Sequence, residues 1–141
     1  MTYLLETSIA VELLRGHREL RSRIRPLVAE GVVAVSACTV AELCYGARRR
    51  REVEAELQKV MGFLAPYQEL AFDDDAAQVY ALLQAGLHQS GVTLPVMDVQ
   101  IGAVALTHGL TLLSADAHFH SIPGLRVLNW LANETDALNG V

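Results

Sequence analysis

Four acidic side chains have positions at which a sheet-based protein could do chemistry: Glu6, Glu42, Asp98 and Asp116. Three of them follow short apolar segments that are typical of buried strands, and Asp98 stands at the start of an apolar helical segment. The carboxyl ends of parallel strands lie at one edge of an open α/β sheet, and ligands bind at that edge. The spacing therefore predicts that the four carboxylates gather at one edge of a sheet.

Gathered carboxylates indicate a metal site and a class of reaction. Like charges in one place repel each other and lower stability unless a cation lies among them. Oxygen ligands without Cys or His in the same motifs favour Mg²⁺ or Mn²⁺ over Zn²⁺. Such an ion activates a water molecule and stabilises the leaving oxygen during phosphodiester hydrolysis. Together the four acids predict a metal-dependent nuclease.

Each acid also has a purely structural interpretation when it is taken alone. Thr39 and Glu42 fit the capping-box pattern, in which Glu42 would cap its own helix. Asp98 suits a helix N-cap and Asp116 suits a turn, while Glu6 would simply end its strand. These interpretations stay open for the individual residues, but they do not account for four acids at one edge.

Strands and helices are predicted in alternation along the chain. Apolar runs predict strands at Tyr3–Leu5 and at residues 32–35, 69–72, 110–113 and 125–128. Apolar spacing predicts helices at residues 9–14, 17–29, 39–47, 53–64, 76–90 and 99–107, with Ser8 as the cap of the first. This alternation predicts an α/β fold with a mostly parallel sheet and helices on both faces. One domain is expected over residues 1–131, followed by a polar, flexible tail at 132–141.

Composition narrows the class of protein. With 141 residues and 52% hydrophobic content, the chain can bury one core. Its formal net charge of -5 argues against a generally basic nucleic-acid binder, although local basic patches are compatible with it. Cys38 and Cys44 lack metal-ligand spacing and suit buried thiols in a reducing compartment. No apolar run has the length of a membrane span and the first residues lack a signal-peptide pattern, so a cytoplasmic protein without membrane contact is expected.

Basic side chains form one local cluster: Arg48, Arg49, Arg50 and Arg51. The cluster follows the predicted helix that carries Glu42, where it could bind RNA phosphates, and Arg15 is a further candidate. Alternatively, the cluster is a solvated helix end that pairs with the glutamates at 52, 54 and 56. Close to Asp116, His118 and His120 favour a surface or supporting role over a role as metal ligands.

Four segments of the chain carry a recognisable pattern. They are Tyr3-Leu4-Leu5-Glu6-Thr7-Ser8; Thr39-Val40-Ala41-Glu42-Leu43 with Tyr45-Gly46; Pro95-Val96-Met97-Asp98-Val99-Gln100-Ile101; and Leu112-Leu113-Ser114-Ala115-Asp116 with Phe119 and Ile122-Pro123-Gly124-Leu125. As an ordered set they resemble the PIN-domain proteins, and in particular the VapC toxins of bacterial and archaeal type II toxin–antitoxin pairs. The resemblance extends from Tyr3 to Trp130.

The resemblance implies a three-layer PIN-like fold and a Mg²⁺- or Mn²⁺-dependent endoribonuclease that cleaves structured cellular RNA, often tRNA or rRNA. It also implies a VapB-like antitoxin whose tail fills the active-site groove, and a homodimer that can join a larger toxin–antitoxin assembly. By position, the family's acidic quartet falls on Glu6, Glu42, Asp98 and Asp116, and its polar helpers fall on Thr7, Ser8 and Ser114.

One position departs from the family pattern, which has aspartate at the end of the first strand where this chain has Glu6. The longer side chain must fold back or displace the metal, and a misplacement of about 1 Å can lower a rate about 100-fold. The alternative to an active nuclease is therefore a catalytically impaired PIN module that binds RNA or antitoxin without efficient cleavage. A receiver-type or haloacid-dehalogenase-type phosphotransfer domain is disfavoured, because Thr7 and Ser8 follow Glu6 where that design needs a second acid.

Overall fold

Five parallel strands form the centre of the structure, a computed structural model that describes residues 1–132. Their order across the sheet is β3-β2-β1-β4-β5. The strands are β1 (Tyr3–Leu5), β2 (Val33–Ser36), β3 (Gln68–Leu70), β4 (Thr111–Leu113) and β5 (Val127–Leu128). Leu5 is paired with Val35 on one side and Leu113 on the other, so the carboxyl ends of β1, β2 and β4 lie next to one another. The predicted parallel α/β sheet is confirmed, and the predicted tail lies outside the described residues from position 133 onward.

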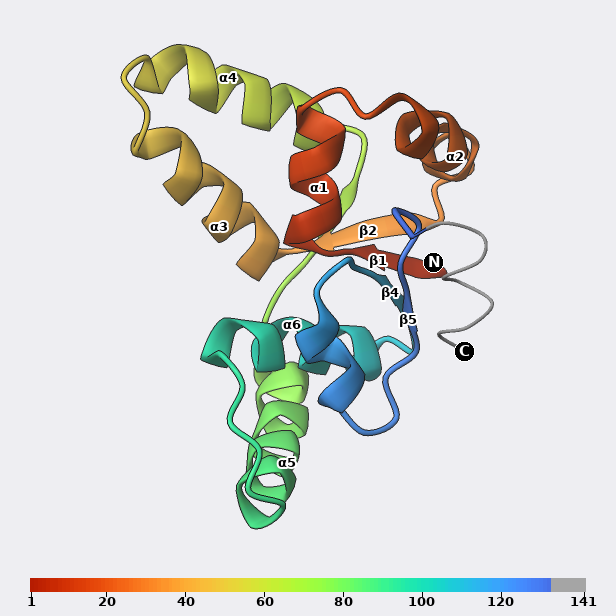
Figure 1. Cartoon of the computed structure of the whole chain (residues 1–141), viewed down its shortest axis with the longest axis vertical. Helices are drawn as coiled ribbons and strands as arrows, with labels where there is room; N and C mark the ends of the chain where they lie inside the picture. The colour runs from red at the N-terminus through yellow and green to blue at the C-terminus, as the bar shows by residue number, and fades with distance from the viewer. Residues whose placement is uncertain (133–141) are drawn as a thin grey trace.

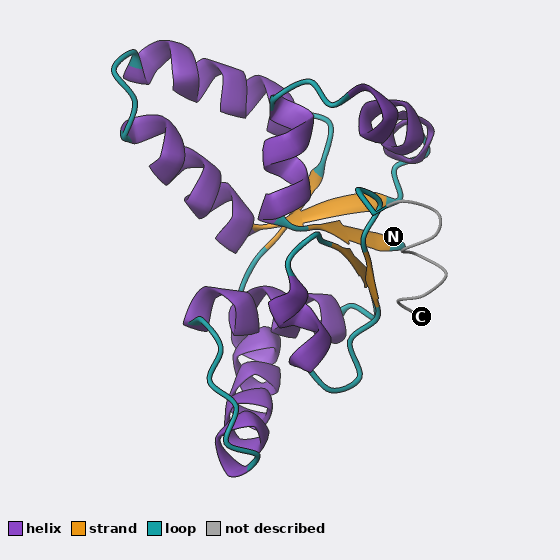
Figure 2. Cartoon of the chain, viewed as in Figure 1, coloured by secondary structure: helices purple, strands orange, loops and turns teal. Residues whose placement is uncertain are grey.

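Helices cover both faces of this sheet (Figures 1 and 2). One face carries α1 (Thr7–Leu14), α2 (Arg18–Ala29), α3 (Ala37–Arg48) and α4 (Val53–Leu64). The other carries α5 (Asp74–Gln89), α6 (Val96–Thr107) and the short 3-10 helix η1 (Ala117–Ser121). Within residues 1–132, no helix combines the length and the apolar character needed to cross a membrane.

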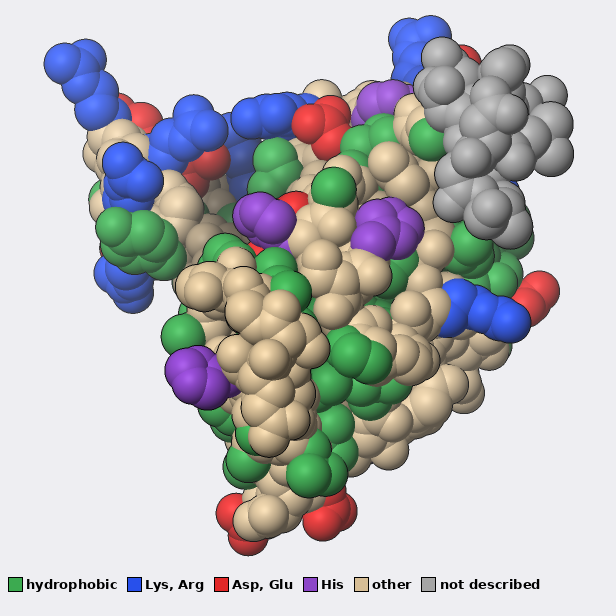
Figure 3. All heavy atoms as spheres, turned by 60° about the horizontal axis from the view of Figure 1, so that its bottom comes forward, with side chains coloured by type: hydrophobic (Ala, Val, Ile, Leu, Met, Phe, Trp, Pro, Cys, Tyr) green, Lys and Arg blue, Asp and Glu red, His purple; other side chains and the backbone are tan. Residues whose placement is uncertain are grey.

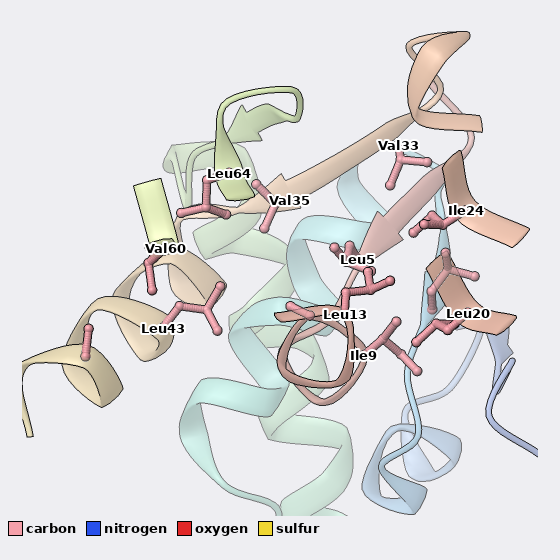
Figure 4. Close-up of a cluster of buried hydrophobic side chains, with 13 residues drawn as sticks. Leu5, Ile9, Leu13, Leu20, Ile24, Val33, Val35, Leu43, Val60 and Leu64 are labelled. Atoms are coloured by element: carbon pink, nitrogen blue, oxygen red, sulfur yellow. The ribbon is translucent and has the colours of Figure 1, made fainter. Parts of the chain in front are cut away.

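Two apolar cores fill the spaces between the sheet and its helices, because successive strand residues point to opposite faces. Leu5, Val33 and Val35 face the core shared with α1 to α4 (Figure 4). Leu4 and Ala34 face the core shared with α5, α6 and η1. Burial on both faces explains why β1 and β2 are continuous apolar runs in the sequence.

The caps of α1 and α3 differ from the predicted ones. Glu6 caps α1, because its side chain accepts a hydrogen bond from the Ser8 N–H, so the prediction of Ser8 as the cap is wrong. Ser36 caps α3 and accepts a hydrogen bond from the Thr39 N–H. The predicted capping box is therefore wrong as well, and Glu42 lies about one turn inside the helix, where it is available for another role.

The two aspartates have different local settings. Asp98 is the third residue of α6, which Pro95 precedes, so the prediction of Asp98 as an N-cap is wrong. Asp116 does occupy a cap, because its side chain accepts a hydrogen bond from the His118 N–H at the start of η1. Helix capping thus explains the position of one carboxylate oxygen of Asp116. It does not explain the position of the Asp98 carboxylate.

Gly102 marks a close approach between α6 and the segment after η1. A Cβ atom at this position would lie 2.6 Å from Cδ1 of Ile122, which is 3% exposed. Gly102→Ala is therefore expected to lower the free energy of unfolding by about 1–3 kcal/mol, the usual cost of overpacking a core. Urea unfolding followed by circular dichroism measures the change.

Gly86 in α5 provides the matched control for this prediction. Nothing lies within 4 Å of a Cβ atom there, so Gly86→Ala is expected to raise the free energy of unfolding by about 0.5–1 kcal/mol through helix propensity. Adding Ile122→Val to Gly102→Ala should recover part of the loss. Equal stabilisation by the two glycine substitutions would contradict the close approach.

Candidate active site

Residues 6 to 8 join β1 to α1 and carry the first part of the site. Glu6 is 4% exposed, and its Oε2 accepts hydrogen bonds from the Ser8 N–H at 2.6 Å, the Ser8 hydroxyl at 2.5 Å and the Ser114 hydroxyl at 3.1 Å. Within residues 1–132, no side-chain hydrogen bond ends on Oε1 of Glu6. The longer glutamate side chain thus folds back onto the start of its own helix.

Ser114 connects Glu6 to Asp116. This serine is 1% exposed and follows β4 directly. Its hydroxyl donates to Glu6 Oε2 and accepts a hydrogen bond from the Asp116 N–H at 3.0 Å. The Ser8 hydroxyl also accepts a hydrogen bond from the Ala115 N–H at 2.9 Å. These bonds hold together the carboxyl ends of β1 and β4.

Asp98 and Asp116 converge on a histidine. The Nδ1 atom of His118 lies 3.3 Å from Asp98 Oδ2 and 3.2 Å from Asp116 Oδ1. One potential ligand atom from each of the three residues lies within 4.8 Å of the other two. The structure therefore brings together two of the four predicted acids and adds His118, for which the sequence favoured a surface or supporting role.

Glu42 approaches the same edge from α3. The Thr7 hydroxyl donates a hydrogen bond to Glu42 Oε1 at 2.6 Å and lies 3.1 Å from the Thr39 hydroxyl. Thr7 directly follows Glu6 in the chain, so this hydrogen bond links the Glu42 side chain to the segment that carries Glu6. Among the described residues, the cluster of close ligand atoms contains neither glutamate, so the four acids share an edge without forming one evenly spaced set.

Burial and repulsion raise the pKa of two carboxyl groups. Burial is the main cause for Glu6, with a smaller contribution from the charge of Asp116, and hydrogen bonds from Ser8 and Ser114 lower that pKa only in part. Burial and then the charge of Asp116 raise the pKa of Asp98, which His118 lowers in part. Asp116 thus couples Glu6 and Asp98 electrostatically. A divalent cation would relieve this repulsion, and the carboxylate oxygens present fit Mg²⁺ or Mn²⁺.

The raised pKa values predict how the stability of the metal-free protein depends on pH. The folded pKa values of Glu6 and Asp98 lie above the ordinary values of 4.5 and 3.8, so the folded state takes up protons before the unfolded state does. Their contribution to stability therefore rises as the pH falls from neutral through the raised pKa values, and it levels off below the ordinary ones. In EDTA, we expect Asp98→Asn to raise the melting temperature at pH 7.5 and to have a smaller effect at pH 4.

Added Mn²⁺ should also stabilise the folded protein, because a cation stabilises the charged carboxylates. At a free concentration 100 times the dissociation constant, the ion is expected to add about 2.7 kcal/mol to the free energy of unfolding of the unsubstituted protein at pH 7.5. Differential scanning calorimetry in EDTA and in Mn²⁺ measures both effects. A lower melting temperature of Asp98→Asn at pH 7.5 in EDTA would contradict the raised pKa of Asp98.

A groove of about 330 Å³ lies between α1, α3 and α4 beside Glu42. Its polar lining consists of Thr7, Arg15, Glu42, Arg50, Glu56 and Lys59. Arg15 and Lys59 each form an ion pair with a glutamate three residues earlier, whereas Arg50 has no ion pair among the described residues. Lys and Arg side chains gather along one edge of the molecule in Figure 3, with acidic side chains among them. The groove is therefore lined both by cationic side chains and by Glu42, which is one of the four predicted site carboxylates.

The five arginines that were predicted to bind RNA do not share one location. Arg15 and Arg50 line the groove, and the others are not among its lining residues. The Arg49 guanidinium lies 5.7 Å from the centre of the Tyr45 ring. Within residues 1–132, no ion pair joins the arginine cluster to the glutamates at 52, 54 and 56, so the alternative role in helix-end pairing is not observed.

Fold and acidic edge together have the arrangement of a PIN domain. The sequence pattern that defines the PIN-domain family matches residues 3–125, which contain all four acids. The chain belongs to the VapC ribonucleases of the PIN-domain family, which are the toxins of toxin–antitoxin systems. The resemblance inferred from the sequence motifs is thereby confirmed.

The relatives cover nearly the whole chain. Ribonuclease VapC2 of Haemophilus influenzae is 30% identical over 133 residues, which are 93% of this chain and 99% of that protein. The tRNA(fMet)-specific endonuclease VapC of Salmonella typhimurium is 26% identical over 132 residues, which are 92% of this chain and 98% of that protein. The crystal structure of DNA-bound VapBC from Salmonella typhimurium matches with a TM-score of 0.87 and 26% identity, covering 92% of this chain and 98% of that chain.

Proposed function

We propose that this ribonuclease cleaves cellular RNA endonucleolytically, as a toxin, with a Mg²⁺ or Mn²⁺ ion held at the carboxyl edge of its sheet. The observation that supports this most strongly is the convergence of Asp98 and Asp116, whose ligand atoms come within 4.8 Å of each other from separate segments. The raised pKa of Asp98, caused first by burial and then by the charge of Asp116, adds support, because a bound cation would stabilise the charged carboxylate.

The proposed catalytic and metal-binding residues are Glu6, Glu42, Asp98 and Asp116. When bound, the ion supplies activation of water and charge neutralisation at the scissile phosphate. Asp98 and Asp116 bind the ion through their carboxylates. Ser8 and Ser114 orient Glu6, and Thr7 orients Glu42, by the hydrogen bonds described above. Such supporting bonds usually alter metal affinity or activity about 10- to 100-fold.

Structured RNA, such as tRNA, is the proposed substrate class, and the groove beside Glu42 is its proposed path. A relative of similar length is named for its action on tRNA(fMet). The groove offers apolar side chains against which a base can pack and cationic side chains for phosphates. Arg50 is the foremost candidate for a phosphate contact, and Arg15, Arg48, Arg49 and Arg51 are proposed to contribute less.

Removal of the Arg50 charge tests this path. Arg50→Ala is expected to weaken tRNA binding about fivefold and to reduce the slope of log K against log salt concentration by about 0.7, as for the loss of one phosphate contact. Binding is measured by fluorescence anisotropy in EDTA, which prevents cleavage. Arg51→Ala is the matched control, because it removes the same charge from the neighbouring position without touching the groove. Equal losses in the two variants would contradict the path.

A second candidate function is binding of RNA or antitoxin by a catalytically impaired module. The specific observation in its favour is the position of Glu6, whose Oε2 is engaged by Ser8 and Ser114. A carboxylate held in this way can contribute less to a metal site than a shorter side chain that points outward.

Cleavage of RNA decides between the two candidates. Purified tRNA is incubated with the protein in Mn²⁺, Mg²⁺ or EDTA, and Asp98→Asn provides the inactive control. Site-specific products with either ion, and none in EDTA or with Asp98→Asn, are expected. Tight tRNA binding without products in any condition would overturn the nuclease and favour the binding module.

A VapB-like antitoxin and a second copy of the chain are the proposed protein partners. Support comes from relatives that crystallised as VapBC complexes bound to DNA. The chain itself exposes large apolar side chains on α3 and α5, where Tyr45 is 65% exposed and Leu82 is 76% exposed. Such side chains suit a homodimer or an antitoxin contact within a larger assembly.

A further inference from the structure

We propose that His118 is a third protein ligand of the divalent cation, through its Nδ1 atom, and that it makes the site prefer Mn²⁺ to Mg²⁺. This inference rests on the proposed function, because it requires the cation that Asp98 and Asp116 are proposed to bind. His118 then adds a nitrogen donor to metal ligands that are otherwise all carboxylates.

The spacing of the donor atoms supports coordination. Neighbouring ligand atoms around an octahedral ion are about 3 Å apart when each bond is about 2.1 Å long. His118 Nδ1 lies 3.3 Å from Asp98 Oδ2 and 3.2 Å from Asp116 Oδ1, which is close to that separation. These two separations place Nδ1 where it can share a coordination shell with either carboxylate, and the three ligand atoms all lie within 4.8 Å of one another.

The hydrogen-bonding capacity of the imidazole also favours a shared cation. Nδ1 carries at most one hydrogen, which can point well at only one carboxylate. A charge-assisted hydrogen bond from nitrogen to a carboxylate is usually about 2.7–2.9 Å long, and both distances here exceed that range. A lone pair of Nδ1 directed at an ion between the two carboxylates satisfies all three groups at once.

The backbone of His118 is held beside Asp116 by contacts that do not involve the imidazole ring. The His118 N–H donates to Asp116 Oδ1 at 2.9 Å, and the next residue, Phe119, is fully buried in the core below η1. The His118 side chain is itself 55% exposed, so burial does little to hold it beside the acids.

Ligand chemistry connects this nitrogen to the choice of ion. Mg²⁺ strongly prefers oxygen ligands, whereas first-row transition ions also accept an imidazole nitrogen. Of the two ions proposed for this site, Mn²⁺ therefore gains from His118 and Mg²⁺ does not.

Pulsed electron paramagnetic resonance of the Mn²⁺-loaded protein tests the assignment directly. A directly coordinated ¹⁴N nucleus modulates the electron spin echo of Mn²⁺, independently of any cleavage. We expect this nitrogen signal in the unsubstituted protein and in His120→Ala, and its loss in His118→Ala. The control residue His120 lies on the same 3-10 helix, two residues further along the chain, and is exposed.

Calorimetric titration supplies a second measurement. His118→Ala is expected to weaken Mn²⁺ binding at least about tenfold and to change Mg²⁺ binding less than about twofold. Circular dichroism confirms that the variants are folded. Mn²⁺ binding without a nitrogen signal in the unsubstituted protein, or with equal affinity in folded His118→Ala, would overturn the role of His118 and leave the carboxylate site standing. Absence of Mn²⁺ and Mg²⁺ binding by the unsubstituted protein would overturn the proposed metal-dependent function itself.

Discussion

Asp116→Asn is expected to lower the rate of RNA cleavage about a thousandfold. The substitution removes one negative charge from the proposed metal site, and a loss of about 4 kcal/mol in transition-state stabilisation corresponds to this factor. The asparagine oxygen can still accept the hydrogen bond from the His118 N–H, so the cap of η1 and the fold should persist. Single-turnover cleavage of end-labelled tRNA in Mn²⁺ measures the rate.

A matched control separates this effect from a general loss of negative charge. Glu19→Gln replaces an exposed carboxylate on α2 by an amide, and the cleavage rate should then stay within about twofold of the unsubstituted value. Melting curves of both variants establish that they are folded. A decrease of less than tenfold in folded Asp116→Asn would be incompatible with Asp116 as a metal-binding residue.

Glu6→Asp is expected to raise the cleavage rate about 10- to 100-fold and to tighten Mn²⁺ binding. Removal of one methylene shortens the side chain by about 1.5 Å, and a change of that size at a catalytic carboxylate has effects of this order. Aspartate is a good N-cap, so the hydrogen bond from the Ser8 N–H can be kept while the carboxylate changes its position. Single-turnover rates and calorimetric titration of Mn²⁺ measure the two quantities.

Glu6→Gln is the companion variant, because it keeps the length of the side chain and removes its charge. We expect it to cleave more slowly than the unsubstituted protein, in contrast to Glu6→Asp. If both variants kept the original rate and the original Mn²⁺ affinity, the carboxylate of residue 6 would have no part in the reaction.

Most elements of the fold could be predicted because their patterns are local. The apolar run Tyr3–Leu5 and the β-branched run before Ser36 indicate strands buried on both faces, and both strands lie in the centre of the sheet. Helix starts were harder to predict, because several residues near each start can accept the same backbone hydrogen bond. Ser36 and Thr39 are both suitable caps for α3. Ser36 is the cap because β2 ends at this residue and the helix begins directly after it.

The candidate site was predicted in part. The sequence correctly indicated that Glu6 and Asp116 come shortly after strands, because strand ends can be recognised locally, and that Glu42 lies on the helix after the second strand. It did not indicate that the Thr7 hydroxyl holds Glu42, or that His118 lies between two carboxylates. The Thr7–Glu42 contact joins residues 35 positions apart in the chain, and the Asp98–His118 contact joins residues 20 positions apart. Patterns within a few neighbouring residues do not predict contacts between residues this far apart in the chain.

The order of apolar and polar residues was enough to predict the parallel α/β architecture and the edge at which the acids lie, and the resemblance of four motifs indicated the family, since each depends on patterns within single segments. Packing of α6 and η1 against the sheet determined the orientation of the side chains. It separated the close cluster of Asp98, Asp116 and His118 from the two glutamates, and it turned Glu6 back onto its own helix. Side-chain direction depends on contacts with distant segments, and those contacts exist only after the chain has folded.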